Sequence, residues 1–144
     1  MVIGIIGENC SGKSTLAGRI KDAIEAEVIT GKDYLRMARS ESEASKLFQE
    51  KLKNAVRGSN IIYIISEPDH LALLPEGTVR ILVTADLDTV KKRFRDRMHG
   101  NLPAPVEKML EKKHGMFDNV PYDYRFDGVK GDAADLCSEI SNLG

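Results

Sequence analysis

Short apolar segments alternate along the chain with longer segments in which apolar residues recur every three or four positions. A short run of β-branched and apolar residues is typical of a strand, whereas the longer spacing is typical of a helix with one buried face. The sequence predicts strands at 2–6, 28–30, 61–65, 79–84 and 124–126. It predicts a first helix that begins after the loop following the first strand and ends at about residue 26. Further helices are predicted over 34–56, 87–98, 104–114 and 133–143.

This alternation predicts an α/β fold, a three-layer sandwich with a five-stranded parallel sheet and helices on both faces. The segment 61–65 is apolar at every position, as expected of a central strand covered on both sides. A length of 144 residues suits a single domain spanning 1–144, with a short helical lid around 91–115. Ligands of such folds bind at the carboxyl ends of the strands, so the residues that follow each strand are the candidates for function.

Composition narrows the classes of partner and location. The 21 basic and 22 acidic residues are balanced, so nucleic acid is not expected as a partner. The sequence shows neither a signal-peptide pattern nor an apolar run long enough to span a membrane. Its two cysteines, Cys10 and Cys137, form neither a disulfide framework nor a metal motif. We therefore expect a cytoplasmic protein without a membrane partner, as a monomer or weak dimer.

The most specific motif follows the first predicted strand directly. The segment Gly7-Glu8-Asn9-Cys10-Ser11-Gly12-Lys13-Ser14 fits the P-loop pattern G-x-x-x-x-G-K-[ST] and precedes a helical segment. Backbone amides of such a loop and the N-terminus of the next helix form a concave anion site. We therefore predict that residues Gly7 to Ser14, with Thr15 behind them, bind ATP. Lys13 is expected to contact the transferred phosphates and Ser14 to bind Mg²⁺.

A second motif follows the second predicted strand and reads Thr30-Gly31-Lys32-Asp33-Tyr34-Leu35-Arg36. Together with the P-loop, it resembles the branch of P-loop nucleoside and nucleotide kinases that includes adenylate, cytidylate and shikimate kinases. In adenylate kinases a Thr-Gly-Asp-x-Leu-Arg segment holds the acceptor, and here Lys32 is an extra residue within that pattern. The resemblance implies that Thr30, Asp33 and Arg36 bind the acceptor. Alternatively, Thr30 and Asp33 cap the following helix and Arg36 is solvated.

The third predicted strand ends in Ser66-Glu67-Pro68-Asp69. Carboxylates at this position often organise magnesium in P-loop enzymes, so Glu67 is a candidate metal ligand and catalytic residue. Asp33 competes with Glu67 for this role, because shikimate kinases carry an acidic residue after the second strand. Adenylate kinases have Asp-Gly-Phe-Pro-Arg after the third strand, and its absence here argues against AMP as the acceptor.

The predicted helix 87–98 carries two arginines, Arg93 and Arg97, on one surface because they are four residues apart. Its segment resembles the helix at the base of the lid in nucleotide kinases, where such a pair neutralises the transferring phosphoryl group. Leu87, Val90, Phe94 and Met98 are predicted to form its buried stripe. The alternative is a solvated basic face.

Together these motifs predict an ATP- and Mg²⁺-dependent kinase for a small acceptor, a nucleoside or a nucleoside monophosphate. Lys13, Asp33, Glu67, Arg93 and Arg97 are the predicted catalytic residues. A GTPase is one alternative class, but it needs an Asp-x-x-Gly element and an Asn-Lys-x-Asp motif, and the sequence has neither. A nucleotide-binding regulatory module, or a slow ATPase without kinase activity, stays open as an alternative.

Overall fold

The computed structural model describes residues 1–143 and contains one five-stranded sheet. All strand pairs are parallel, and the strand order is β2-β3-β1-β4-β5. The strands are β1 (Val2–Ile6), β2 (Glu27–Thr30), β3 (Ile61–Ile65), β4 (Val79–Thr84) and β5 (Tyr124–Asp127). The predicted parallel α/β sheet is thereby confirmed.

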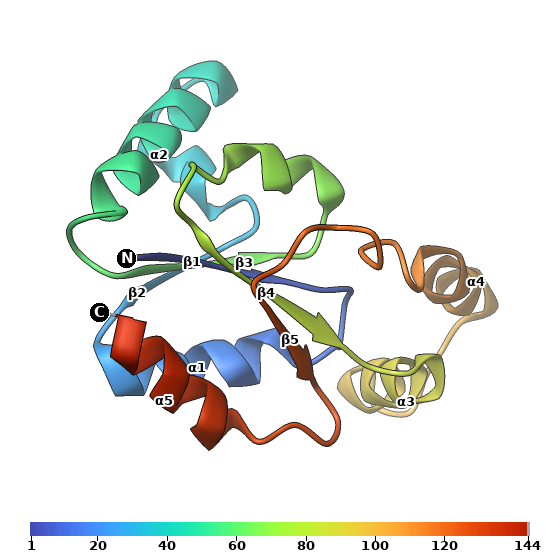
Figure 1. Cartoon of the computed structure of the whole chain (residues 1–144). Helices are drawn as coiled ribbons and strands as arrows, with labels where there is room; N and C mark the ends of the chain where they lie inside the picture. The colour runs from blue at the N-terminus through green and yellow to red at the C-terminus, as the bar shows by residue number, and fades with distance from the viewer. Residues whose placement is uncertain (144) are drawn as a thin grey trace.

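Helices cover both faces of this sheet, as predicted (Figure 1). One face carries α1 (Lys13–Ile24) and α5 (Ala133–Leu143), and the other carries α2 (Glu41–Ala55) with the short 3₁₀ helices η1 (Asp33–Met37) and η2 (Pro68–Leu73). Helices α3 (Leu87–Arg97) and α4 (Ala104–Lys113) lie beyond the carboxyl end of β4. Within residues 1–143, no helix combines the length and apolar character needed to cross a membrane.

The two cores follow from the alternation of side chains along each strand. Val2 and Ile6 of β1 pack on the face of α2, whereas Ile3 and Ile5 of the same strand pack on the face of α1 and α5. Every residue of β3 is buried, as expected of a strand with helices on both faces. Packing on both faces holds the sheet in place, and the sheet in turn positions the loops at its carboxyl edge.

The predicted continuous helix over 34–56 is wrong. The chain forms η1, passes through Ala38 in an extended conformation, and only then begins α2. Ser40 explains the break because its hydroxyl accepts a hydrogen bond from the Glu43 amide, which caps the new helix.

The predicted apolar stripe of α3 is also partly wrong. Val90 is fully buried, but Met98 is 47% exposed. The helix ends at Arg97, so Met98 leaves the helical spacing that would have directed it inward. Val90 and Phe94 therefore anchor the helix in a small core with Cys10 and Leu110, whereas Met98 does not contribute.

Candidate functional site

The P-loop lies between β1 and α1 and is held in a tight curve. The Gly7 amide donates to the Ile65 carbonyl at 3.2 Å, which ties the start of the loop to β3. Cys10 and Gly12 both adopt positive φ, at 64° and 110°. The curve ends where the Leu16 amide donates to the Gly12 carbonyl and α1 begins. This geometry leaves the first amides of α1 without helical partners, as an anion site requires.

Lys13 lies inside the curve rather than in solvent. Its side chain is mostly covered, with 6% of the residue exposed, and its Nζ donates to the Glu8 carbonyl at 2.7 Å. Burial lowers the pKa of Lys13 to about 8, opposed by the nearby Cys10 thiol and reinforced by the positive charge of Arg97. A partly desolvated ammonium group held by a single carbonyl is well suited to exchange that carbonyl for a phosphate oxygen.

The three hydroxyl groups of the loop differ in their exposure. Ser14 and Thr15 are exposed in the first turn of α1. The Ser11 hydroxyl is buried without a partner, which leaves a polar group available inside the loop. Among residues 1–143 no group of three or more His, Cys, Asp or Glu side chains is placed to hold a metal.

A pocket of about 620 Å³ opens beside the loop. It lies between the start of α1, α3 and the segment that follows β5, and its polar lining includes Arg19, Arg93, Arg97, Lys130 and Asp132. The structure thus brings both predicted arginines of α3 to the pocket that adjoins the P-loop.

The two arginines differ in their surroundings. Arg93 is half-buried, and its guanidinium donates to the Cys10 carbonyl at 3.1 Å and to the Gly128 carbonyl at 2.8 Å. Arg97 is exposed, lines the same pocket, and is close enough to lower the pKa of Lys13. Arg93 therefore joins the P-loop to the loop after β5, whereas Arg97 adds a positive charge to the pocket beside the P-loop.

Gly128 makes this junction possible. Its amide donates to the Thr84 carbonyl at 2.6 Å, and an added Cβ would lie 1.8 Å from the Ser11 carbonyl oxygen. Only a residue without a side chain allows this approach of two backbones. Ser11 and Gly128 are far apart in the chain, so no spacing along the sequence indicates this contact.

The predicted acceptor residues occupy the carboxyl ends of two neighbouring strands. Thr30 ends β2 and pairs in register with Ile64 of β3, so Asp33 and Glu67 follow adjacent strands. Asp33 and Arg36 are exposed on η1. Glu67 precedes η2, makes no side-chain cap, and lies 3.5 Å from the Lys113 ammonium group. Thr30, Asp33 and Glu67 thus share one edge of the sheet.

Sequence reasoning missed the contacts of the Glu8 side chain. Its carboxylate binds the His114 ring and the Gly115 amide, which connects the P-loop to the end of α4. These partners are 106 and 107 residues away, and no spacing along the sequence indicates the contact.

Comparisons with known proteins identify the fold. No family model matches the chain, and no curated protein matches it. Solved structures do match, among them a gluconokinase from Sinorhizobium meliloti 1021, at 14% identity and a TM-score of 0.62, covering 98% of this chain and 89% of that one. A shikimate kinase from Acinetobacter baumannii in complex with shikimate matches at 16% identity and a TM-score of 0.61, covering 99% and 91%.

A third match is the tunicamycin resistance protein of Deinococcus radiodurans, at 16% identity and a TM-score of 0.65, covering 99% of this chain and 94% of that one. At these identities the likeness concerns the fold and extends over nearly the whole of each chain. The chain has the α/β fold of the P-loop kinases.

Proposed function

We propose that the protein is an ATP- and Mg²⁺-dependent phosphotransferase that acts on a small acceptor, a nucleoside or nucleoside monophosphate. The observation that carries the proposal is the buried Lys13 ammonium group within the curved loop, with Arg97 lining the pocket beside that loop. Kinases among the proteins of similar fold support it.

The P-loop residues Gly7 to Thr15 hold the phosphates in this proposal. Their backbone amides donate hydrogen bonds to the phosphate oxygens, and the Lys13 ammonium group exchanges the Glu8 carbonyl for a phosphate oxygen. Ser14 and Glu67 hold the metal, which when bound neutralises charge on the phosphates. Arg97 stabilises the charge that develops during transfer, while Arg93 joins the P-loop to the loop after β5 through the Cys10 and Gly128 carbonyls.

The acceptor lies at the carboxyl ends of β2 and β3. Asp33 or Glu67 orients its nucleophilic oxygen, Thr30 contacts it, and Arg36 binds its anionic group as a planar bidentate donor. The names of two similar structures, a gluconokinase and a shikimate kinase, favour a hydroxy acid as a second candidate acceptor.

The test is formation of ADP from ATP and Mg²⁺ in the presence of three acceptor panels: nucleosides, nucleoside monophosphates and hydroxy acids. The proposal expects ADP formation that depends on a member of the first two panels. Turnover only with a hydroxy acid would support the kinase activity but show that the acceptor is a hydroxy acid. Binding of ATP with no acceptor-dependent turnover would identify a regulatory module or slow ATPase instead.

A further inference from the structure

The carboxylate of Glu8 is used in a way that a phosphate loop does not require. It is 13% exposed, and its two oxygens accept from different groups: the His114 Nδ1 at 2.6 Å and the Gly115 amide at 3.0 Å. Because a carboxylate only accepts, the Nδ1 atom of His114 carries the proton in this pair. Charge-assisted bonds of this kind are stronger than those between neutral groups.

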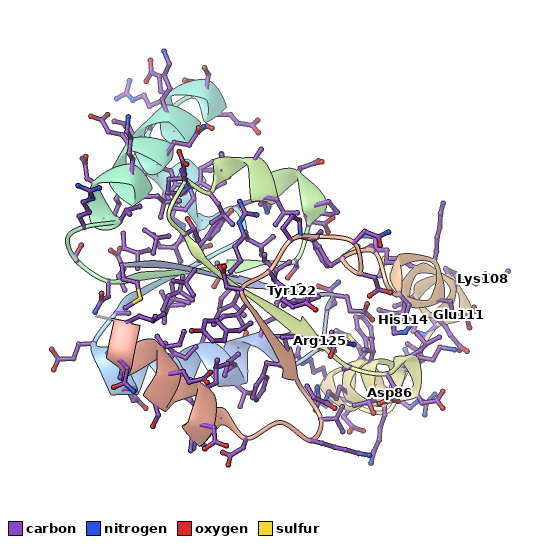
Figure 2. The ribbon with its side chains drawn as sticks, in the orientation of Figure 1. Asp86, Lys108, Glu111, His114, Tyr122 and Arg125 are labelled. Carbon is purple, nitrogen blue, oxygen red and sulfur yellow. The ribbon has the colours of Figure 1, made fainter. Side chains whose placement is uncertain are left out.

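Both partners belong to the segment 113–118, which we call the strap. His114 ends α4 in an extended conformation, and Gly115 follows with φ of 78°. Figure 2 shows His114 between α4 and the sheet. Phe117 is 3% exposed and packs in the core on the α2 face, so the strap crosses from α4 to the sheet beside the P-loop.

The strap also brings a charge to the acceptor edge. Lys113 directly precedes His114, and its Nζ lies 3.5 Å from Glu67 Oε1, at the end of β3. The position of this ammonium group therefore depends on where the end of α4 is held. On the P-loop side, the Glu8 backbone carbonyl accepts from Lys13. Glu8 thus contacts Lys13 through its backbone carbonyl and the strap through its side chain.

We propose that Glu8 is a positioning residue that holds the strap and thereby places Lys113 beside Glu67 at the acceptor edge. The inference rests on the proposed function for the role of that edge. It assigns the Glu8 side chain to the acceptor half of the site, although its backbone belongs to the nucleotide half.

The experiment compares Glu8→Ala and Glu8→Gln with a matched control. Glu111→Gln removes a carboxylate that binds Lys91 at 2.7 Å and joins α3 to α4 without contacting the P-loop. Two readouts are measured: hydrogen exchange of the strap amides in the nucleotide-free protein, and steady-state kinetics with the acceptor found in the screen. ADP affinity is measured in parallel.

In Glu8→Ala we expect exchange at Gly115 to accelerate about tenfold, as loss of a charge-assisted hydrogen bond predicts. The acceptor KM should rise about tenfold while ADP affinity changes less, because the P-loop binds phosphates through its backbone. Glu8→Gln, which still offers an oxygen to the Gly115 amide, should fall between wild type and Glu8→Ala. Glu111→Gln should leave exchange at Gly115 unchanged.

Wild-type exchange in Glu8→Ala would overturn the inference whatever the kinetics. Faster exchange with an unchanged acceptor KM would overturn the positioning role and leave a purely structural contact. If wild type turns over no acceptor, the proposed function and the acceptor role fail together, and the exchange result alone decides whether Glu8 holds the strap.

Discussion

At the scale of single residues, Lys13 shows how burial prepares a group for its ligand. The ammonium group has lost most of its water and donates a hydrogen bond to the Glu8 carbonyl. Its pKa is lowered to about 8 because burial penalises the charged form. A bound phosphate chain would favour that charged form again. In the proposed kinase, protonation of Lys13 and nucleotide binding would therefore be coupled.

This coupling predicts that affinity for ADP falls as the pH rises through about 8. Above that pH the free protein holds Lys13 neutral, and binding must take up a proton. Calorimetry should show about tenfold weaker binding near pH 9 than near pH 7, since the protonated fraction drops by that factor. Lys13→Met should bind weakly with no such dependence. An affinity of wild type that is constant over this range would contradict the coupling.

The lowered pKa of Lys13 also determines how the free energy of unfolding depends on pH. Because the pKa of Lys13 is lower in the folded protein than its ordinary value of 10.5, the unfolded chain binds more protons between about 8 and 10.5. The free energy of unfolding attributable to Lys13 therefore rises with pH across this window. Denaturant titrations give the free energies of unfolding of wild type and of Lys13→Met, and these two values should converge as the pH rises through this window. A difference between them that does not change with pH would contradict the assignment.

Arg36 provides the test of the acceptor residues. If its guanidinium binds an anionic group of the acceptor, Arg36→Ala should raise the acceptor KM about tenfold or more and leave the ATP KM nearly unchanged. Arg39→Ala, a neighbouring exposed arginine beyond η1, is the matched control. A larger effect on the ATP KM than on the acceptor KM would contradict the assignment of Arg36.

At the scale of elements, the site depends on how helices begin. The Asp86 carboxylate caps α3 by accepting from the Thr89 amide at 3.0 Å and the Thr89 hydroxyl at 2.7 Å. Figure 2 places Asp86 at the start of this helix. These bonds lower the pKa of Asp86 below its ordinary value. The cap fixes the helix that carries both arginines of the pocket.

We expect Asp86→Ala to lower the melting temperature by a few degrees. Asp88→Ala, which removes an exposed acid two residues later in the first turn of α3 that does not cap the helix, should have a smaller effect. Because the folded-state pKa of Asp86 is lowered, its stabilising effect is full above the ordinary carboxyl range and is lost as pH falls through the folded value. Thermal melts should therefore show the two variants converging in acid. A difference that persists there would contradict the cap.

The approach of the loop after β5 to the P-loop gives a second test at this scale. Gly128→Ala would place a methyl group 1.8 Å from the Ser11 carbonyl oxygen, so one loop must move. Overpacking of this kind costs about 1–3 kcal/mol, and ADP affinity should fall with stability. Gly18→Ala is the control, because its Cβ meets no atom within 4 Å and should stabilise α1 by roughly 0.5–1 kcal/mol. Wild-type ADP affinity in Gly128→Ala would contradict the role of this contact.

At the scale of the whole molecule, what the sequence predicted depended on local signals. Apolar periodicity predicted the strands and the parallel sheet, and the P-loop was found because its pattern is contiguous. The break before α2 was missed because Ser40 as a helix cap competes with a continuous helical pattern. The contacts of Glu8 with His114 and of Arg93 with Gly128 were not predictable, since they depend on loops brought together by the sheet order.

The most direct test of the account is a calorimetric titration of Mg²⁺-ATP into the purified wild-type protein and into Lys13→Ala. We predict saturable binding at one site per chain in wild type and loss of most of this affinity in Lys13→Ala, with the variant keeping the circular dichroism spectrum of the wild-type fold. No heat of binding in wild type, or equal affinity in the folded variant, would contradict the phosphate site and the proposed kinase with it.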